Sequence, residues 1–567
     1  MKLIIKNSHF KIIYSNLQEK QKIKPFLIEK FTFKDEALLR TYEVKKGLKS
    51  PFVSFYIEEY DLLPTGFLPF AKVYLKKENF EYELEDLRRF PYVNEEFLNS
   101  NMSIKGRDGI LYTPRDYQLE AVRTVVKKKG NNICIFTGGG KSLIHAMFLR
   151  VYSKSKILNV FDRIDLIDQT YRNFTEKYGF DRKEIGIIQG SRVEDDRRIT
   201  LLSLQSYESA MGLFPNVSVI ICDESHTTGR SETAEKIIYS CQNAPIKIGM
   251  SATTDKIANP YQQAKLYSLL GPIVYKKEII EGIEEKALSP GDVVFHKYNS
   301  EAKEIKGTYQ DSYETKKIPK GYLKSLKFKT NKIYKQSEVI KEIEDKDEIN
   351  KIKQIIQLKD DEKLLDYLNE IINKDFEQSL INEGWEIFNK KGERYKRRFL
   401  EFGDESNSYI ENEVRNRLIK KIALEESLSG KRTLIMFSRI SHGEKLKELL
   451  PEALLISGIN SLKERDEVEK YINENKNGIV ISSTIWSTGK DIPSLEIFIN
   501  CSGGKSAISV IQRLGRLTRN SVKSGKKKFR FHDFMDDHIN SIARKQTQER
   551  IKILTDLKLP IFYKEHN

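Results

Sequence analysis

The chain has 567 residues, about four times the ~150 residues of a typical domain, so we expect several domains. Hydrophobic residues make up 39% of the chain and charged residues 31%, which excludes a wholly disordered protein. No run of about 18 apolar residues occurs, so we expect a cytoplasmic protein with no membrane contact. The small number of cysteines excludes a disulfide scaffold, and they lack metal-ligand spacing; they are Cys134, Cys222, Cys241 and Cys501.

The chain is basic. Its 97 Lys and Arg residues outnumber its 81 Asp and Glu residues, for a formal net charge of +16, as is typical of proteins that bind nucleic acid. Residues 1–50 contain 12 basic and 5 acidic side chains, and residues 511–530 contain 8 basic and none acidic. Lysine enrichment from an AT-rich coding sequence could explain part of the total, but it does not explain this clustering.

The predicted elements change character along the chain. Residues 1–105 contain aromatic-rich, strand-like stretches and predict a small α+β N-terminal domain. From about residue 131, short β-branched runs alternate with helical segments, which is typical of buried parallel strands with helices on both faces. The runs predicted as strands are 131–136, 156–161, 199–202, 217–222 and 246–250.

A second α/β domain is predicted because the same alternation returns at 433–437, 479–481 and 495–499. Between the two domains, Ile and Leu recur at helical spacing among charged residues, which predicts a mainly helical insertion. The fold class is therefore α/β, with two tandem parallel-sheet lobes, an N-terminal α+β domain and a helical insertion between the lobes. The predicted boundaries are 1–105, 106–299, 300–425 and 426–567.

A glycine-rich turn follows the first strand and precedes a helix. Glycines allow backbone N–H groups to turn toward phosphates, and the helix N-terminus adds a favourable dipole. Lys141 could bridge the β- and γ-phosphates of ATP, and the Ser142 hydroxyl could ligate Mg²⁺. Ile135-Phe136 replace the small residue that the general pattern has early in the loop. The predicted phosphate-binding loop is Thr137, Gly138, Gly139, Gly140, Lys141 and Ser142.

Two carboxylates follow the predicted strand 217–222, about 80 residues after the loop. Ligands of open parallel sheets bind at the carboxyl edge, where these residues fall. Asp223 would hold Mg²⁺, and Glu224 would activate the attacking water. His226 could relay the state of the nucleotide, or it could be a structural hydrogen-bonding residue.

Two further segments fit the nucleotide. Upstream of the loop, Gln118 could hydrogen-bond the adenine edge and Arg115 could cover its face, although the segment also reads as a simple helix start. Near the C-terminus, arginines recur at a spacing of three after Gln512. Arg516 and Arg519 could reach the γ-phosphate as arginine fingers; a solvated basic helix is the alternative.

Taken in order, these motifs resemble those of the superfamily 2 DExH helicases over essentially residues 110–535. The matching motifs are Tyr117-Gln118, the loop at Lys141, Asp223-Glu224-Ser225-His226, Ser251-Ala252-Thr253, Thr488-Gly489-Lys490-Asp491 and Gln512 to Arg519. Shorter matches resemble the phage UvsW-type DNA helicases, although the long insertion departs from their compact form. They are Gly307-Thr308-Tyr309-Gln310-Asp311, Phe437-Ser438-Arg439-Ile440-Ser441-His442-Gly443, Ser487-Thr488-Gly489 and Leu514-Gly515-Arg516.

The resemblance implies two RecA-like lobes that close on ATP and Mg²⁺, with nucleic acid crossing both lobes. It assigns coupling of hydrolysis to lobe motion to Ser251, Ala252 and Thr253, and nucleotide sensing to Gly489 and Asp491. Residues at strand ends would contact phosphates, with little sequence preference, although ordinary loop polarity also explains each of them. They are Arg163, Gln205, Ser206, Ser438, Arg439 and Thr484.

For the substrate, the resemblance implies branched or duplex DNA, with fork regression, junction branch migration and removal of RNA from hybrids, in recombination, repair or replication. Single-strand-binding or recombination proteins would be partners. An RNA helicase remains an alternative, as does the motor portion of a restriction-type system, for which Asp35, Glu43 and Lys45 offer a carboxylate–lysine cluster. The intact set of Lys141, Glu224 and Arg516 argues against a non-catalytic binding module.

Overall fold

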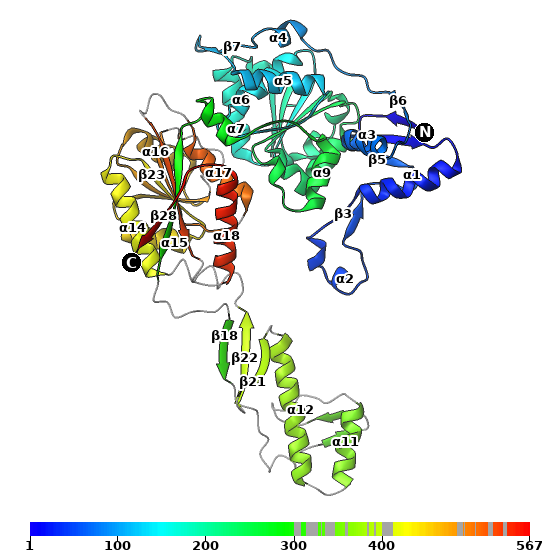
Figure 1. The fold of residues 1–567 in the computed structure, drawn as a ribbon, viewed down its shortest axis with the longest axis vertical. Coiled ribbons are helices and arrows are strands. Elements are labelled where there is room, and N and C mark those ends of the chain that lie inside the picture. Colours follow the sequence, from blue (N-terminus) through cyan, green and yellow to red (C-terminus); the bar gives the residue numbers. More distant parts are fainter. Residues whose placement is uncertain are drawn as a thin grey trace. The chain divides into compact units, whose positions relative to one another are not determined.

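The structure is a computed structural model of the chain (Figure 1). It describes residues 1–299, 412–484, 492, 494–504, 506–519, 526–536 and 541–566, together with seven elements between residues 300 and 411. The described chain divides into two units. One holds the N-terminal segment and both large sheets, and the other consists mainly of residues 298–416.

The first lobe is built on an eight-stranded sheet in the order β12-β11-β13-β10-β14-β15-β9-β16. Strand β12 lies at one edge and pairs antiparallel with β11, and the other seven strands all pair in parallel. The central strands are apolar on both faces because helices cover both sides, with α5 and α6 on one side and α9 on the other in Figure 1. The strands are β9 (Asn131–Ile135), β10 (Ile157–Phe161), β11 (Ile185–Gln189), β12 (Arg192–Val193), β13 (Ile199–Ser203), β14 (Val219–Asp223), β15 (Ile246–Ser251) and β16 (Ile273–Lys277), and the helices are α5 (Asp116–Lys127), α6 (Lys141–Val151), α7 (Ile164–Arg172), α8 (Glu232–Ser240), α9 (Pro260–Leu270) and α10 (Ile279–Glu284).

The second lobe is built on a seven-stranded sheet in the order β24-β25-β23-β26-β27-β17-β28. Strands β24, β25, β23, β26 and β27 pair in parallel. The two parallel-sheet lobes confirm the predicted α/β fold class. The strands are β17 (Gly291–Tyr298), β23 (Thr433–Phe437), β24 (Leu454–Ile456), β25 (Ile479–Ser483), β26 (Ile497–Asn500), β27 (Phe529–Met535) and β28 (Ile561–His566), and the helices are α14 (Glu413–Leu428), α15 (Ile440–Leu449), α16 (Leu462–Glu474), α17 (Ala507–Leu517) and α18 (Ser541–Asp556).

The N-terminal segment forms a four-stranded sheet in the order β5-β2-β1-β6. Its aromatic core continues into the first lobe: Phe70 stacks on Tyr267 and Phe55 on Tyr261, both from α9. Gly66 lies so close to the carbonyls of α9 that a Cβ there would clash with the Tyr267 carbonyl oxygen. The segment is therefore packed onto the first lobe. Its elements are β1 (Lys2–Ile5), β2 (His9–Ile13), α1 (Leu17–Lys30), β3 (Thr32–Lys34), η1 (Leu38–Arg40), α2 (Tyr42–Lys45), β4 (Phe52–Ser54), β5 (Leu62–Pro64), η2 (Thr65–Phe67), α3 (Leu68–Lys77) and β6 (Glu83–Asp86).

One boundary in the middle of the chain needs correction. Residues 291–298, which the predicted boundary at 299 placed in the first lobe, form β17 (Gly291–Tyr298) of the second sheet, between β27 and β28. The described residues of the insertion are mainly helical, as predicted, but they also include short strands. The sequence did not indicate these strands, because polar β-hairpins carry no helical pattern and little apolar alternation. Its described elements are β18 (Thr308–Ser312), β19 (Lys327–Lys329), β20 (Lys332–Tyr334), α11 (Lys346–Gln357), α12 (Asp361–Asn382), β21 (Trp385–Lys390) and β22 (Glu393–Phe399).

The register of the first sheet gathers the predicted motifs at one edge. Asp223 at the end of β14 lies opposite Met250 of β15, and Ser251 lies opposite Cys134 of β9. Because parallel strands end together, the glycine-rich loop, the two carboxylates and Ser251 come side by side. Within the described part of the chain, every helix is too short or too polar to span a bilayer.

Candidate functional site

The glycine-rich loop is held in shape by its own backbone and by α5. Gly138 and Gly140 have φ values of 85° and 74°, a left-handed conformation that glycine adopts without strain. The Tyr117 hydroxyl and the Gln118 amide both donate to the carbonyl oxygen of Gly139, at 2.8 and 2.9 Å. Lys141 then begins α6, so the loop leads directly into a helix N-terminus.

Gln118 is placed differently from its predicted contact with adenine. Its Oε1 accepts a hydrogen bond from the Arg115 backbone N–H at 2.8 Å, while its Nε2 donates to Gly139. Both ends of this buried amide are therefore engaged within the protein, and in this structure the amide supports the loop. Arg115 lies on the wall of the cavity in front of the loop.

Asp223 and Glu224 turn sharply out of the sheet. Glu224 has a φ of 44° and a ψ of 49°, a left-handed conformation that a non-glycine residue adopts only under some strain. The Asp223 carboxylate accepts a hydrogen bond from the Glu224 backbone N–H at 3.0 Å, which fixes the turn. The turn separates the two side chains: both line a smaller cavity beside α6, but only Glu224 lines the larger one in front of the loop.

The two carboxylates are electrostatically unequal. Burial and the neighbouring Glu224 charge raise the pKa of Asp223. Burial opposes ionisation of Glu224 as well, but the His226 hydrogen bond and the positive charge of Lys141 outweigh it and lower the Glu224 pKa. Of the two, Glu224 is the residue kept ionised, as a base that activates water requires.

A buried hydrogen-bond network runs from Glu224 into the next strand. His226 Nδ1 lies 2.8 Å from Ser251 Oγ and 3.3 Å from Glu224 Oε2. Ser251 Oγ also donates to Glu224 Oε2 at 3.3 Å and accepts from the Thr253 backbone N–H at 3.2 Å. The network therefore connects Glu224 to Ser251 and to the backbone of Thr253.

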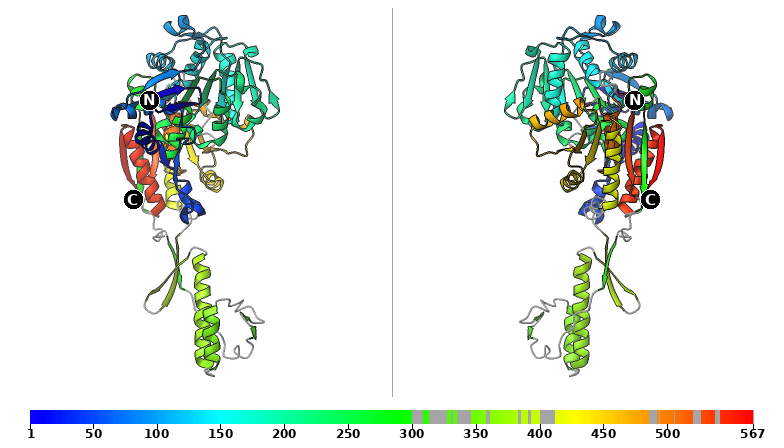
Figure 2. Two further views of the ribbon diagram at one scale, coloured as in Figure 1. Left: turned by 90° about the vertical axis from the view of Figure 1, so that its right-hand side faces the viewer. Right: turned by 90° about the vertical axis from the view of Figure 1, so that its left-hand side faces the viewer.

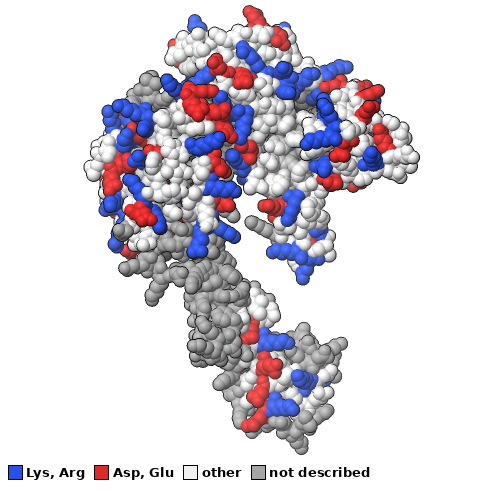
Figure 3. Space-filling model, in the orientation of Figure 1, with Lys and Arg blue, Asp and Glu red and all other residues white. Residues whose placement is uncertain are grey.

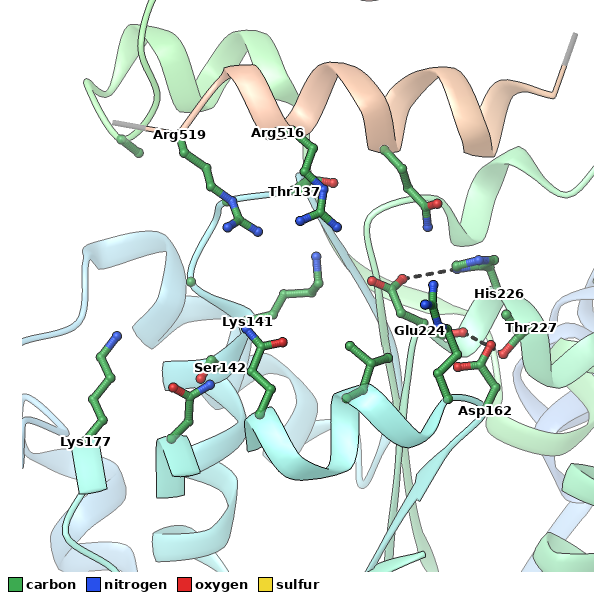
Figure 4. A pocket seen from close by; sticks show the side chains of 18 of the residues that line it. Thr137, Lys141, Ser142, Asp162, Lys177, Glu224, His226, Thr227, Arg516 and Arg519 are labelled. Atoms are coloured by element: carbon green, nitrogen blue, oxygen red, sulfur yellow. Dashed lines mark hydrogen bonds and ion pairs between the residues drawn. The ribbon is translucent and has the colours of Figure 1, made fainter. Parts of the chain in front are cut away.

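Side chains from the second lobe complete the site. A cavity of about 460 Å³ lies in front of the loop, and Gln512 and Arg516 of α17 line it together with Arg519, two residues beyond the end of this helix. Figure 4 shows Arg516 and Arg519 pointing toward the side of the cavity that holds Lys141 and Glu224. The remaining lining residues come from the first lobe or the link to β17; they are Arg115, Thr137, Gly138, Gly140, Lys141, Ser142, Asp162, Arg163, Leu166, Gln169, Asn173, Lys177, Tyr178, Glu224, His226, Thr227 and Ala287.

Helix α17 comes very close to the loop. A Cβ atom on Gly515 would overlap the side chain of Thr137, so only glycine fits here. The contact is reinforced where the backbone N–H of Ser289 donates to the Thr518 carbonyl at 2.7 Å. These contacts hold the two arginines over the loop.

The residues beside the loop fit a magnesium ion. Ser142 and Asp223 line a cavity of about 120 Å³ together with Lys141 and Glu224. Hydroxyl and carboxylate oxygens are hard ligands, and Mg²⁺ in phosphate sites takes only one or two protein ligands. Among the described residues, no group of three or more His, Cys, Asp or Glu side chains could hold a metal ion.

The basic stretch 511–530 divides into residues with different roles. Arg513 is buried and donates to Asn500 Oδ1 and the Gly503 carbonyl, both at 3.0 Å, so it does not share the cavity with the next two arginines. Lys526 is also buried; its Nζ donates to the Leu517 carbonyl and, at 3.0 Å, to the Arg519 carbonyl. Burial lowers the pKa of Lys526 to about 7. This lysine secures the end of α17.

The predicted strand-contacting residues lie at strand ends. Ser438 and Thr484 follow β23 and β25, whose register pairs Phe437 with Ser483, so they lie at neighbouring positions on one edge. In the first lobe, Gln205 and Ser206 follow β13, but the Ser206 hydroxyl already accepts from the Gly190 N–H at 2.9 Å. Of the remaining predicted strand contacts, Arg439 is the residue before α15, and Arg163 lines the cavity in front of the loop. The predicted nucleotide-sensing residues Gly489 and Asp491 lie outside the described residues.

Two further residues, Asp162 and Lys177, line the cavity and were not predicted from the sequence to do so. Asp162 follows β10, the neighbour of β14, and its Oδ1 is buried without a hydrogen-bond partner in the described structure. Burial and the nearby Glu224 charge raise the Asp162 pKa. Lys177 lies beyond α7 and also lines the cavity. The position of Asp162, directly after a buried strand adjacent to β14, is a signal that could have identified it.

Comparisons with known proteins agree with this site. Residues 111–256 match the family described as "Type III restriction enzyme, res subunit", and residues 414–521 match "Helicase conserved C-terminal domain". The first segment holds the loop and both carboxylates, and the second holds α17 up to Arg519.

Several whole proteins are similar at low identity. The chain is 24% identical over 415 residues to a DNA 3'-5' translocase XPB2 of Sulfurisphaera tokodaii, covering 72% of this chain and 79% of that protein. It is 23% identical over 485 residues to the ATP-dependent DNA helicase uvsW of Enterobacteria phage T4, covering 81% and 76%. The crystal structure of T4 UvsW matches with a TM-score of 0.43 and 18% identity, over 100% of this chain and 99% of that one.

Glu224→Gln should lower ATP turnover by roughly 10²-fold or more, because an amide cannot take a proton from water. The amide is nearly isosteric, so nucleotide binding should persist. Single-turnover ADP formation and nucleotide affinity, measured on the same preparation, test this. ADP formation at the wild-type rate would exclude Glu224 as the base.

Gly515→Ala should lower ATP turnover by about tenfold, because its methyl group meets Thr137 and keeps α17 off the loop. Alanine is the better helix former by about 1 kcal/mol, so a loss cannot come from helix propensity. Gly212→Ala, where a Cβ has open space, is the matched control. Steady-state kcat and thermal midpoints of both variants give the answer; equal kcat values would contradict the close contact.

Lys526→Met should lower ATP turnover by about three- to tenfold, because the Leu517 and Arg519 carbonyls at the end of α17 lose their buried donor. It should leave the salt dependence of DNA binding unchanged, since Lys526 is buried. Lys528→Met, at an exposed position two residues on, is the control. It should lower the salt dependence of DNA binding and leave ATP turnover unchanged. The measurements are kcat and the slope of log affinity against log salt. A changed slope in Lys526→Met alone would contradict the assignment.

Proposed function

Because the chain belongs to the superfamily 2 DExH helicases and is an ATP-dependent helicase, we propose that it converts ATP hydrolysis into movement along DNA and remodels branched duplexes. The observation that carries this proposal is the shared cavity: Lys141 and Glu224 line it from the first lobe, and Arg516 and Arg519 line it from the second. A triphosphate held there would bridge the two lobes, and its hydrolysis would remove the bridge.

Each residue of the cavity has a proposed role in hydrolysis. Lys141 binds the β- and γ-phosphates, and the N–H groups of the loop donate to them. Glu224 orients and deprotonates the attacking water, while Arg516 and Arg519 stabilise the charge that develops on the transferred phosphoryl group. Ser142 and Asp223 would hold Mg²⁺, which neutralises phosphate charge when bound.

Coupling to movement is proposed to run through the hydrogen-bond network. His226 joins Glu224 to Ser251, and Thr253 follows at the same strand end. When the γ-phosphate leaves, Glu224 and the arginines lose a shared partner, so the network and the position of α17 respond together. Gln512 lies in the same cavity and is proposed to sense the same change.

DNA is the proposed substrate, for three reasons. The chain carries a formal net charge of +16. Two of the similar proteins are named as a DNA translocase and a DNA helicase. Exposed polar residues such as Ser438 and Thr484 follow adjacent strands, where contacts to phosphates would track a strand without reading its sequence. We also propose that residues 1–105 contribute to DNA binding and that strand-contacting roles fall to Gln205, Ser206 and Arg439.

Branched DNA is the finer part of the proposal, and it comes from the resemblance to UvsW-type enzymes. Fork regression, junction branch migration and removal of RNA from hybrids are the proposed reactions. A restriction-type nuclease is not favoured, because Asp35 Oδ1 accepts a hydrogen bond from Asn259 Nδ2 at 2.8 Å.

ATPase stimulation should be strongest with forked or four-way DNA, weaker with linear duplex and weakest with RNA. A comparison of these polymers at matched nucleotide concentration tests the substrate class, and Lys141→Ala provides the background rate. A gel assay of fork regression on the best substrate then tests the reaction. Stimulation by RNA alone would favour the RNA helicase alternative and contradict the proposal.

A further inference from the structure

A projecting arm in the N-terminal segment has no role in the site described above. We define the arm as residues 32–54, which leave the N-terminal sheet through β3 and return through β4 (Figures 1 and 2). Its root is firmly attached: Phe33 packs against Phe55 and Phe67. The arm is therefore an ordered projection with a fixed base.

The tip of the arm, residues 38–52, leaves apolar side chains in solvent. Helix α2 buries no residue, and four large side chains of the tip are exposed. The exposed fractions are 39% for Leu39, 70% for Tyr42, 75% for Leu48 and 57% for Phe52. Single exposed apolar residues are common, but four within fifteen positions of the chain are a high density, and groups of exposed apolar side chains mark binding sites.

Positive charge accompanies these apolar side chains. The tip contains four basic residues and one acidic residue in sequence, and Lys45, Lys46 and Lys49 are exposed. Lys46 Nζ lies 5.8 Å from the centre of the Tyr42 ring. Figure 3 shows Lys and Arg side chains at the end of the arm. Aromatic faces beside flexible cations match the chemistry of a nucleic acid, in which bases stack on the ring and phosphates pair with the lysines.

Other occupants fit this surface less well. A lipid surface is recognised by a long amphipathic helix, whereas α2 has four residues. A protein partner would need a larger apolar area than four separated side chains provide. The lysines complement a polyanion, so DNA is the occupant favoured by charge.

An intact duplex offers little to the apolar part of the tip, because its bases are stacked on each other. Bases become available to an aromatic side chain where pairing stops, at a fork, a junction or a strand end. We propose that the arm binds DNA at such a branch point, with Tyr42 stacking on an exposed base and Lys45, Lys46 and Lys49 pairing with phosphates beside it. This inference rests on the proposed DNA substrate and adds the element that distinguishes branched from linear DNA.

Tyr42→Ala combined with Leu48→Ala tests the stacking surface. Binding to a fork, a four-way junction, a linear duplex and single-stranded DNA is measured by fluorescence anisotropy without ATP. We expect fork and junction affinity to fall by about tenfold, the loss of one base–aromatic stack, with linear duplex affinity unchanged. The matched control is Val73→Ala with Lys76→Ala, which removes an exposed apolar residue and a lysine from α3 of the same segment.

A base analogue placed at the branch reports the stacking itself. The fluorescence of 2-aminopurine should be quenched on binding by the wild-type protein and by Tyr42→Phe, but not by Tyr42→Ala. Equal loss of affinity for all DNAs, or unchanged fork affinity, would overturn the inference. Unchanged fork affinity with loss of a protein partner would assign the arm to protein docking instead.

ATPase stimulation by single-stranded DNA separates this inference from the proposed function. In the arm variants it should remain at the wild-type level, because the arm does not contribute to the nucleotide cavity. If no DNA stimulates the wild-type enzyme, the proposed function fails, while the binding comparison of fork and duplex still decides the role of the arm.

Discussion

The close approach of α17 to the glycine-rich loop is the constraint on which the cavity depends, because a Cβ on Gly515 would overlap the side chain of Thr137. Six Lys and Arg side chains line the nucleotide cavity, against the two carboxylates of Asp162 and Glu224. A triphosphate bound there would add negative charge among these side chains and would contact residues of both lobes. Its binding would favour the arrangement in which α17 lies against the loop, so this arrangement and the affinity for a triphosphate would be linked quantities.

The carboxylate pair and the hydrogen-bond network fit this view. Glu224 is kept ionised by His226 and Lys141, while Asp223 is held closer to its neutral form by burial and by its neighbour. A single network therefore contains Glu224, His226 and Ser251. A change in the nucleotide at Glu224 would thereby alter hydrogen bonds of residues that do not contact the nucleotide. The strained backbone of Glu224 is maintained by this surrounding packing.

Sequence patterns predicted the central strands and the motifs better than the edges. Strand β14 is buried on both faces and begins with the unbroken apolar run 219–222, whereas β28 is mostly exposed and its second half is polar. The arginine spacing did not separate Arg513 from Arg519, because it does not say where the helix ends: Arg513 lies within α17 and is buried, whereas Arg519 lies beyond Leu517 and lines the cavity. Burial of Lys526 depends on where the chain returns after α17, which no local pattern contains. The roles of the strand-end polar residues remain predictions for the same reason: their neighbours come from distant segments.

Strand β17 also has a mechanical consequence. The chain leaves the first lobe at the end of α10 and enters the second sheet at Gly291, so residues 285–290 form the tether between the lobes. Six residues span at most about 20 Å when extended, which limits how far the lobes can separate. Arg516 and Arg519 therefore stay near the loop at a high effective concentration. If the two lobes separate, the second lobe should return to the first faster than two unlinked domains would meet. The long insertion follows β17, which already belongs to the second sheet, so it does not lengthen the tether of residues 285–290.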